Sequence, residues 1–160
     1  MIDFLKRLFA PAEPIITEAT AADASDIASL HGQSFRRGWS EDEVERLLVD
    51  RAVLAHRVKV GRRFAGFILS RRAADESEIL SVATAATMRG RGVARRMLDL
   101  HLRRLAGLGI RTVFLEVDEA NAPARRLYAR AGFQEVGRRP GYYPIGNGQR
   151  SSAVVLRRDL

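Results

Sequence analysis

The stretch RGRGVARRML, residues 89–98, brings two glycines and four arginines together where a helix is predicted to begin. Glycine weakens a helix and clustered like charges repel, so helix stability alone does not explain the stretch. A predicted strand, SEILSVAT at 77–84, precedes it, and an amphipathic helix is predicted to follow it to about Ala106. A turn between a strand and a helix offers free backbone N–H groups to an anion, and glycine lets a phosphate approach closely. The stretch therefore predicts an anion site, unless it is a plain connection with solvated arginines.

The wider sequence excludes several other kinds of site. No Gly-Lys-Ser or Gly-Lys-Thr follows, as a P-loop requires, and Arg95 stands where the dinucleotide motif has its third glycine. His31, His56 and His101 lack the spacing of metal ligands, and the chain has neither a cysteine nor a Gly-x-Ser-x-Gly motif. We therefore expect no metal site.

The chain after the glycine stretch predicts one more strand, one helix and a closing pair of strands. A nearly continuous apolar run at 111–117 predicts a central strand covered on both faces. Asn121 and Pro123 are typical of a helix start, and Gly132 follows the expected helix end at Ala131. The closing strands are expected at 133–139 and 151–158, and the loop that joins them at 140–149.

Upstream, two capping boxes and a hairpin pattern organise the chain. Thr20 with Asp23 predicts a helix to about Ser34, and Ser40 with Glu43 predicts a second helix to about Asp50. A first strand is expected at 14–19, and the two strands of an antiparallel hairpin are expected at 52–60 and 64–72. Strands followed by alternating helices and strands predict a mixed α/β sheet with at least one parallel crossover.

Composition bounds the class of protein. The chain has 160 residues, 46% hydrophobic and 29% charged, which is typical of one globular domain. No apolar run reaches the ~18 residues of a membrane span, and we expect a cytoplasmic protein. The net charge of +8 attracts RNA, but equally a small ligand with several phosphates. We expect no direct DNA binding.

The first residues are expected to form a leader ahead of the domain. We expect this leader to span residues 1–14, where the sequence is compatible with a helix, and a single domain to span residues 15–160. As a helix the leader would carry an apolar stripe opposite Lys6 and Arg7. Such a segment packs on its own domain or anchors the chain to a membrane or a partner.

Two spaced motifs resemble those of the GNAT family of N-acetyltransferases. Arg89-x-x-Gly92-x-Ala94 matches the family's pyrophosphate-binding motif, Gln/Arg-x-x-Gly-x-Gly/Ala, and FLEVDEANAPARRLYARAGF at 114–133 resembles its second landmark. The resemblance implies a mixed central sheet of about six to seven strands with about four helices. It also implies that the sheet splays between the fourth and fifth strands.

Within that family the chain looks most like the ribosomal-protein-alanine N-acetyltransferases. SFRRGWSEDEVERLL at 34–48 and GRRPGYYPIGNG at 137–148 resemble motifs of that group, and the resemblance runs from about Ile15 to Leu156. The group usually carries an acidic pair where this chain has Ser151 and Ser152. That departure concerns the acceptor side.

The resemblance implies that acetyl-CoA is the donor and assigns residues to it. One strand would lie beside the pantetheine arm, the glycine stretch would bind the pyrophosphate mainly through backbone amides, and Arg91 and Arg95 would add charged contacts. Asn121 would contact the donor besides capping its helix. The full implied set is Val82, Ala83, Thr84, Arg89, Gly90, Arg91, Gly92, Val93, Ala94, Arg95 and Asn121.

The resemblance implies a general base at Glu116 and a general acid at Tyr128. An amine must lose a proton to attack a thioester, and the sulfur leaves more easily when it is protonated. An α-amine with a pKa of about 7.7–8.0 is partly neutral at pH 7, whereas a lysine amine at about 10.4 is almost fully charged. One carboxylate therefore suits an α-amine. Alternatively, Tyr128 only packs in the core and Glu116 is only a strand-end carboxylate.

On the acceptor side the resemblance implies Trp39, Tyr142 and Tyr143, which otherwise are packing or surface aromatics. The function so implied is acetyl transfer to a protein N-terminus, in particular the N-terminal alanine of a small-subunit ribosomal protein, within a ternary complex. Two alternatives stay open. The acceptor is a lysine or a small-molecule amine, or the chain is a basic RNA- or ribosome-binding module with vestigial catalysis.

Overall fold

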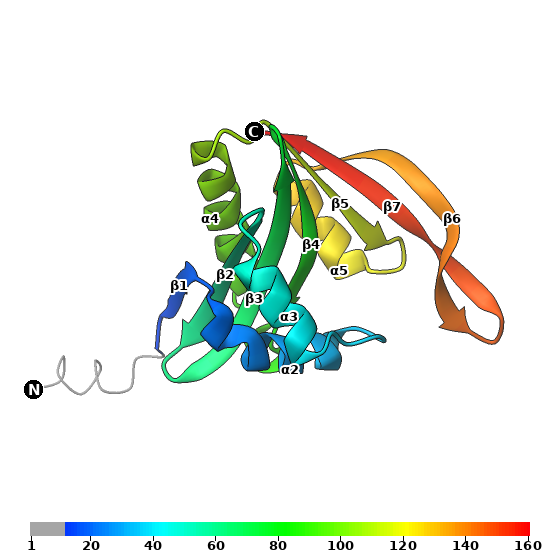
Figure 1. Ribbon diagram of the computed structural model, residues 1–160. Coiled ribbons are helices and arrows are strands. Elements are labelled where there is room, and N and C mark those ends of the chain that lie inside the picture. Colours follow the sequence, from blue (N-terminus) through cyan, green and yellow to red (C-terminus); the bar gives the residue numbers. More distant parts are fainter. Residues whose placement is uncertain (1–11) are drawn as a thin grey trace, which may run out of the picture.

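The fold is built on one sheet of seven strands in the order β1-β2-β3-β4-β5-β7-β6. The computed structural model describes residues 12–160, so most of the predicted leader lies outside the described residues. Figure 1 shows the sheet with its β6–β7 hairpin extending to one side. The strands are β1 (Pro14–Glu18), β2 (Val53–Val60), β3 (Arg63–Ala73), β4 (Glu76–Thr84), β5 (Thr112–Asp118), β6 (Gln134–Gly146) and β7 (Gln149–Asp159).

Two pairs of helices cover the two faces of the sheet (Figure 1). The helices are α2 (Ala24–Ser34), α3 (Glu41–Val49), α4 (Val93–Gly107) and α5 (Ala122–Arg130). Phe67 and Leu69 of β3 pack toward α2 and α3, whereas Ile68 between them packs toward α4. This alternation follows from the pleat of a strand. The sheet therefore separates two hydrophobic cores.

The predicted caps fix where the helices begin. The Ser40 side chain accepts a hydrogen bond from the Glu43 N–H at 3.2 Å, and the Glu43 carboxylate accepts one from the Ser40 N–H at 2.7 Å. Asn121 Oδ1 accepts a hydrogen bond from the Ala124 N–H at 3.2 Å. These bonds satisfy N–H groups that have no partner inside the helix.

The sheet splays between β4 and β5, its only parallel pair among residues 12–160. Glu76–Ile79 pair with Thr112–Leu115, and beyond that point the two strands run on without pairing to each other. β4 continues to Thr84 and β5 to Asp118. Figure 1 shows the two strands moving apart. The predicted mixed sheet, its parallel crossover and its splay are thus confirmed.

The prediction that the strand at 111–117 is covered on both faces is wrong. Val113, Leu115 and Val117 are buried, but Phe114 and Glu116 on the other face are only partly covered. α2 and α3 pack mainly on β2, β3 and β4, so they cover this face of β5 only in part. An apolar run alone does not show which face a neighbouring helix reaches.

The predicted loop at 140–149 is largely strand. β6 runs on to Gly146, and Asn147 with φ of 50° and Gly148 with φ of 72° form the turn to β7. Asn-Gly is the preferred pair for a two-residue hairpin turn, because both residues tolerate positive φ. The register shifts between Arg139 and Tyr143, so the hairpin carries a bulge there.

A buried polar cluster lies between α4 and the sheet. His56 Nδ1 of β2 and His101 Nδ1 of α4 are 2.8 Å apart, and His101 Nε2 is 2.5 Å from Ser70 Oγ of β3. His101 is fully buried. Burial, with a smaller effect of His56, lowers the pKa of His101 from 6.5 to about 3.

We expect the protein to lose stability in mild acid because of this cluster. An unfolded histidine takes up a proton below its usual pKa of 6.5, whereas buried His101 stays neutral down to about pH 3. Unfolding is therefore favoured by about 2 kcal/mol more at pH 5 than at pH 7.5. Urea unfolding at the two pH values measures this. In the variant His101→Gln the difference should be smaller by about 2 kcal/mol, and an unchanged difference in that variant would contradict the explanation.

Candidate active site

The glycine stretch forms a left-handed turn that opens α4. Gly90 and Gly92 have φ of +75° and +73°, and Gly92 is the N-cap of the helix. A Cβ added to either glycine would meet no atom within 4 Å, so the space beside the turn is open. The unpaired N–H groups of the first turn and the helix dipole face this space. The local geometry suits a bound anion.

Beside the turn, one edge of β4 has no strand partner. β4 pairs with β3 along its length, but its pairing with β5 stops at Ile79. The predicted residues Val82, Ala83 and Thr84 lie in the part of β4 beyond that point. An extended ligand can therefore add to this edge as a further strand would.

A groove of about 680 Å³ joins the turn to this strand edge, and we call it the glycine-turn groove. Its lining includes ten of the eleven predicted donor residues, all except Arg91: Val82, Ala83, Thr84, Arg89, Gly90, Gly92, Val93, Ala94, Arg95 and Asn121. Ser34 and Phe35 contribute from the end of α2, and Tyr128 contributes from α5.

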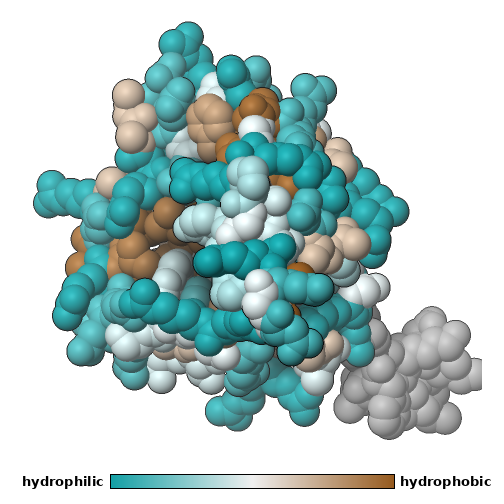
Figure 2. Space-filling view, turned by 90° about the vertical axis from the view of Figure 1, so that its right-hand side faces the viewer, coloured by the Kyte–Doolittle hydropathy of each residue, from teal (hydrophilic) through white to brown (hydrophobic). Residues whose placement is uncertain are grey.

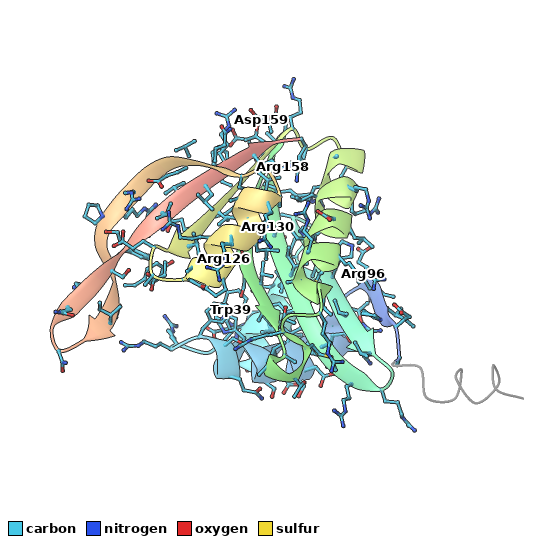
Figure 3. All side chains as sticks on the ribbon, turned by 180° about the vertical axis from the view of Figure 1, so that it is seen from behind. Trp39, Arg96, Arg126, Arg130, Arg158 and Asp159 are labelled. Atoms are coloured by element: carbon cyan, nitrogen blue, oxygen red, sulfur yellow. The ribbon has the colours of Figure 1, made fainter. Side chains whose placement is uncertain are left out.

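Two arginines of the groove were missed from the sequence. Arg126 and Arg130 of α5 line it, are exposed, and lie on α5 in the view of Figure 3. They are four residues apart, a spacing that places both on one face of a helix. That spacing, on the helix that Asn121 caps, is the signal that could have found them.

The arginines of the turn differ in their surroundings. Arg89 lines the groove and is exposed. Arg95 also lines the groove, but its Nε donates to both carboxylate oxygens of Asp99 at 2.9 Å. Arg91 is not among the lining residues, and its Nη1 lies 3.9 Å from the Met88 sulfur. The predicted contacts of Arg91 and Arg95 with a donor stay predictions.

Tyr128 reaches the glycine-turn groove from the buried side of α5. Its ring meets Phe133 edge-on, with ring centroids 5.7 Å apart. Burial raises the pKa of Tyr128 from 10.0 to about 12, so its hydroxyl keeps its proton at neutral pH. The residue can therefore donate a proton or a hydrogen bond into the groove.

A second cavity lies on the other side of β4, and we call it the Trp39 cavity. It measures about 890 Å³, and it brings together Trp39, Glu116, Tyr142 and Tyr143 from three separate segments. Figure 2 shows a hollow beside hydrophobic residues on this side of a largely hydrophilic surface. The other lining residues are Arg37, Glu43, Arg46, Leu47, Asp50, Arg71, Glu78, Ile79 and Leu80.

Glu116 enters the Trp39 cavity from the partly covered face of β5. Its side chain is 23% exposed, and its Oε1 lies 3.0 Å from Arg139 Nη2. The Arg139 guanidinium also stands 5.7 Å from the centre of the Tyr142 ring. Burial, followed by the charge of Glu116, raises the pKa of Tyr143. Arg139 had no assigned role in the sequence, because its contact with Glu116 joins two strands that are distant in sequence.

The two residues predicted for acid–base chemistry line different cavities. Glu116 lines the Trp39 cavity and Tyr128 lines the glycine-turn groove. β4 contributes to both cavities: Ile79 and Leu80 line the Trp39 cavity, and Val82 to Thr84 line the glycine-turn groove. The splay of β4 and β5 lies between them. This arrangement suits two ligands whose reacting ends meet at the splay.

The serine pair of β7 faces carboxylates from the end of β5. Ser151 Oγ donates to Asp118, and the Ser152 N–H donates to Glu119 Oε1 at 3.1 Å. The hydrogen bond from the Ser152 backbone, ahead of the effect of Arg138, lowers the pKa of Glu119. Negative charge is thus present beside the serines, although the pair itself is neutral.

Two further findings concern residues 12–160 alone. No group of three or more His, Cys, Asp or Glu side chains there is placed to hold a metal ion. No helix of this described part is long and apolar enough to cross a membrane.

Comparisons with known proteins agree with this arrangement. The model of the acetyltransferase (GNAT) family matches residues 24–133. The [ribosomal protein bS18]-alanine N-acetyltransferase of Haemophilus influenzae is 30% identical over 142 residues, which cover 89% of this chain and 96% of that protein.

Solved structures share the fold. The ribosomal-protein-S18-alanine N-acetyltransferase of Escherichia coli superposes with a TM-score of 0.85 at 23% identity, covering 92% of this chain and 94% of that one. NAA60 of Arabidopsis thaliana, solved in complex with acetyl-CoA, gives a TM-score of 0.80 at 20% identity, covering 92% and 99%. Because the family model spans more than half of its length, the chain belongs to the GNAT family of acetyltransferases.

Proposed function

We propose that this N-acetyltransferase transfers an acetyl group from acetyl-CoA to the N-terminal α-amine of a protein, in particular the N-terminal alanine of a small-subunit ribosomal protein. The observation that carries the proposal is the Trp39 cavity, which sets the Glu116 carboxylate among aromatic side chains beside the splay. The H. influenzae relative, similar over nearly the whole chain, is named for acetylating such an alanine. Since ribosomal proteins are the proposed acceptors, we place the activity in the cytoplasm.

Acetyl-CoA fits the glycine-turn groove. Its pyrophosphate would bind the open turn at Gly90 and Gly92 and the first N–H groups of α4. Its pantetheine arm would add to the free edge of β4 as an extended strand. Exposed Arg89, Arg126 and Arg130 supply positive charge for its phosphates.

The two acid–base residues then have distinct tasks in a ternary complex. Glu116, acting through water, takes a proton from the amine, whose nitrogen attacks the thioester carbonyl. A backbone N–H of β4 at Val82–Thr84 stabilises the oxyanion of the tetrahedral intermediate. The attack forms the C–N bond; as the intermediate collapses and the C–S bond breaks, the Tyr128 hydroxyl gives its proton to the departing sulfur. No covalent enzyme intermediate is needed.

A panel of peptides tests the proposed function. One peptide begins with a free alanine and lacks lysine, and its counterpart has a blocked N-terminus and one internal lysine. After incubation with acetyl-CoA, mass spectrometry locates the added acetyl group. We expect acetylation of the free α-amine. Exclusive acetylation of the blocked, lysine-bearing peptide would overturn the proposal.

The arginines of α5 provide a prediction for the donor side. Replacing both Arg126 and Arg130 by alanine should raise KM for acetyl-CoA by about tenfold or more, because two charge-assisted phosphate contacts are lost. The KM for the peptide should change little, since neither residue lines the Trp39 cavity. Arg103→Ala, an exposed arginine of α4 outside the groove, is the matched control. An unchanged KM for acetyl-CoA in the double variant would remove these arginines from the donor site.

A further inference from the structure

The segment between α2 and α3 borders both substrate cavities. Ser34 and Phe35 line the glycine-turn groove, whereas Arg37 and Trp39 line the Trp39 cavity. Six consecutive residues, 34–39, thus reach from one proposed substrate to the other. Whatever holds this segment in place also shapes the walls of both sites.

His31 of α2 packs against two residues of the segment, Phe35 and Trp39. Its ring stacks on Trp39, with centroids 4.1 Å apart and planes 13° from parallel, and it contacts Phe35 at 4.4 Å. The Trp39 backbone N–H donates to His31 Nδ1 at 3.1 Å. His31 is only 4% exposed, and Phe67 of β3 lies behind it. One buried ring therefore contacts an aromatic residue of each cavity.

A second contact brings the segment back onto α2. A Cβ built on Gly38 would lie 2.9 Å from the Gly32 Cα, closer than side-chain atoms normally approach. The segment is thus held at two points, the backbone contact at Gly32 and the hydrogen bond to His31. Of these two, only the hydrogen bond depends on a titratable group.

We propose that His31 is a positioning residue, whose neutral Nδ1 holds Trp39 in the wall of the acceptor cavity. The proposal rests on the proposed function for the identity of the acceptor. An imidazole nitrogen accepts a hydrogen bond only while it carries no proton. Protonation of Nδ1 would therefore release the Trp39 N–H and free the end of the segment.

The surroundings of the ring favour its neutral form. Burial lowers the pKa of His31 below its usual 6.5, and Glu43 of α3 opposes this to a lesser extent. Glu43 is itself 3.7 Å from Arg37, while β3 presents the apolar Phe67. The folded pKa lies below the unfolded one, so the segment is fully held above about pH 6.5 and loses stability as the pH falls below it.

Trp39 reports on its own position, because it is the single tryptophan of the chain. Tryptophan fluorescence of the full chain is followed from about pH 8 to about pH 5, a range that brackets the usual histidine pKa. The emission should change with a midpoint below pH 6.5. His31→Asn places an oxygen near the position of Nδ1 and does not titrate, so its emission should stay constant. Gln33→Ala, on the same helix, should behave like the natural protein.

Kinetics separate positioning from general loss of structure. His31→Phe keeps the ring stack but removes the hydrogen-bond acceptor, and it should raise the KM for the N-terminal peptide by about 3–10-fold, the effect of one hydrogen bond. The KM for acetyl-CoA and kcat should stay within about twofold. His31→Asn should have the natural peptide KM at neutral pH. In acid the peptide KM of the natural protein should rise further as His31 is protonated, and that of His31→Asn should not. Ionisation of the peptide amine affects all variants equally and cancels in the comparison.

Two results would overturn the proposal: wild-type peptide KM in His31→Phe, or the same acid-induced fluorescence change in His31→Asn as in the natural protein. The fluorescence titration needs no turnover. If no N-terminal peptide is acetylated, the proposed acceptor is wrong, and the titration still decides the role of His31. If His31→Phe does not fold, the His31→Asn titration decides it alone.

Discussion

Replacing Glu116 by glutamine lowers kcat for peptide acetylation at pH 7 by about 10²–10⁴-fold, the usual contribution of a general base. Glutamine has the same shape and still offers an oxygen to Arg139, which lies 3.0 Å from the natural carboxylate. It does not accept a proton from the amine. Initial-rate kinetics with a free N-terminal peptide measure the loss, and the KM for acetyl-CoA should stay within about twofold because Glu116 does not line the glycine-turn groove.

The pH dependence of this loss distinguishes a base from a binding residue. An α-amine with a pKa of about 7.7–8.0 is mostly neutral at pH 9 and then needs little help from a base. The defect should therefore shrink as the pH rises. Glu78→Gln is the matched control, since it changes a second carboxylate of the same cavity and should affect peptide KM alone. A wild-type kcat at pH 7 in Glu116→Gln would remove Glu116 from the mechanism.

Replacing Tyr128 by phenylalanine lowers kcat by about 10²–10³-fold, within the range of a general acid. The variant keeps the edge-on contact with Phe133, so its thermal stability should change little. Because burial raises the pKa of Tyr128 to about 12, the natural enzyme should not lose this acid as the pH rises through the neutral and mildly alkaline range. Steady-state rates and thermal unfolding test both expectations.

Tyr143→Phe is the matched control for Tyr128→Phe, because it removes a phenol from the Trp39 cavity instead of the glycine-turn groove. We expect it to alter peptide KM and to leave most of kcat. If Tyr128→Phe retains the natural kcat while Tyr143→Phe loses it, the proton for the leaving sulfur comes from the acceptor side.

The features that local sequence predicts well are those set by local physical chemistry. The Ser40–Glu43 capping box and the cap at Asn121 concern neighbouring backbone groups, and the structure contains both. The left-handed glycines at 90 and 92 likewise follow from the residue type. Whether these elements bind the predicted ligands is a separate matter, which the kinetic predictions address.

The features that were missed depend on contacts between distant segments. His31 and Trp39 are joined by a backbone hydrogen bond, and His101 finds partners on two strands far from it in sequence. The partial cover of one face of β5 depends on how far α2 and α3 extend. Arg139 of β6 reaches Glu116 of β5 across the sheet. No periodicity or motif within one segment contains this information.

The parting of β4 and β5 has a consequence for evolution. The first half of β4 borders the Trp39 cavity and its second half borders the glycine-turn groove. Each substrate therefore has its own cavity with its own lining residues. Changes in the residues that line the Trp39 cavity can then alter acceptor binding without changing the residues that line the glycine-turn groove. One fold can in this way acquire new acceptor substrates while its donor stays the same.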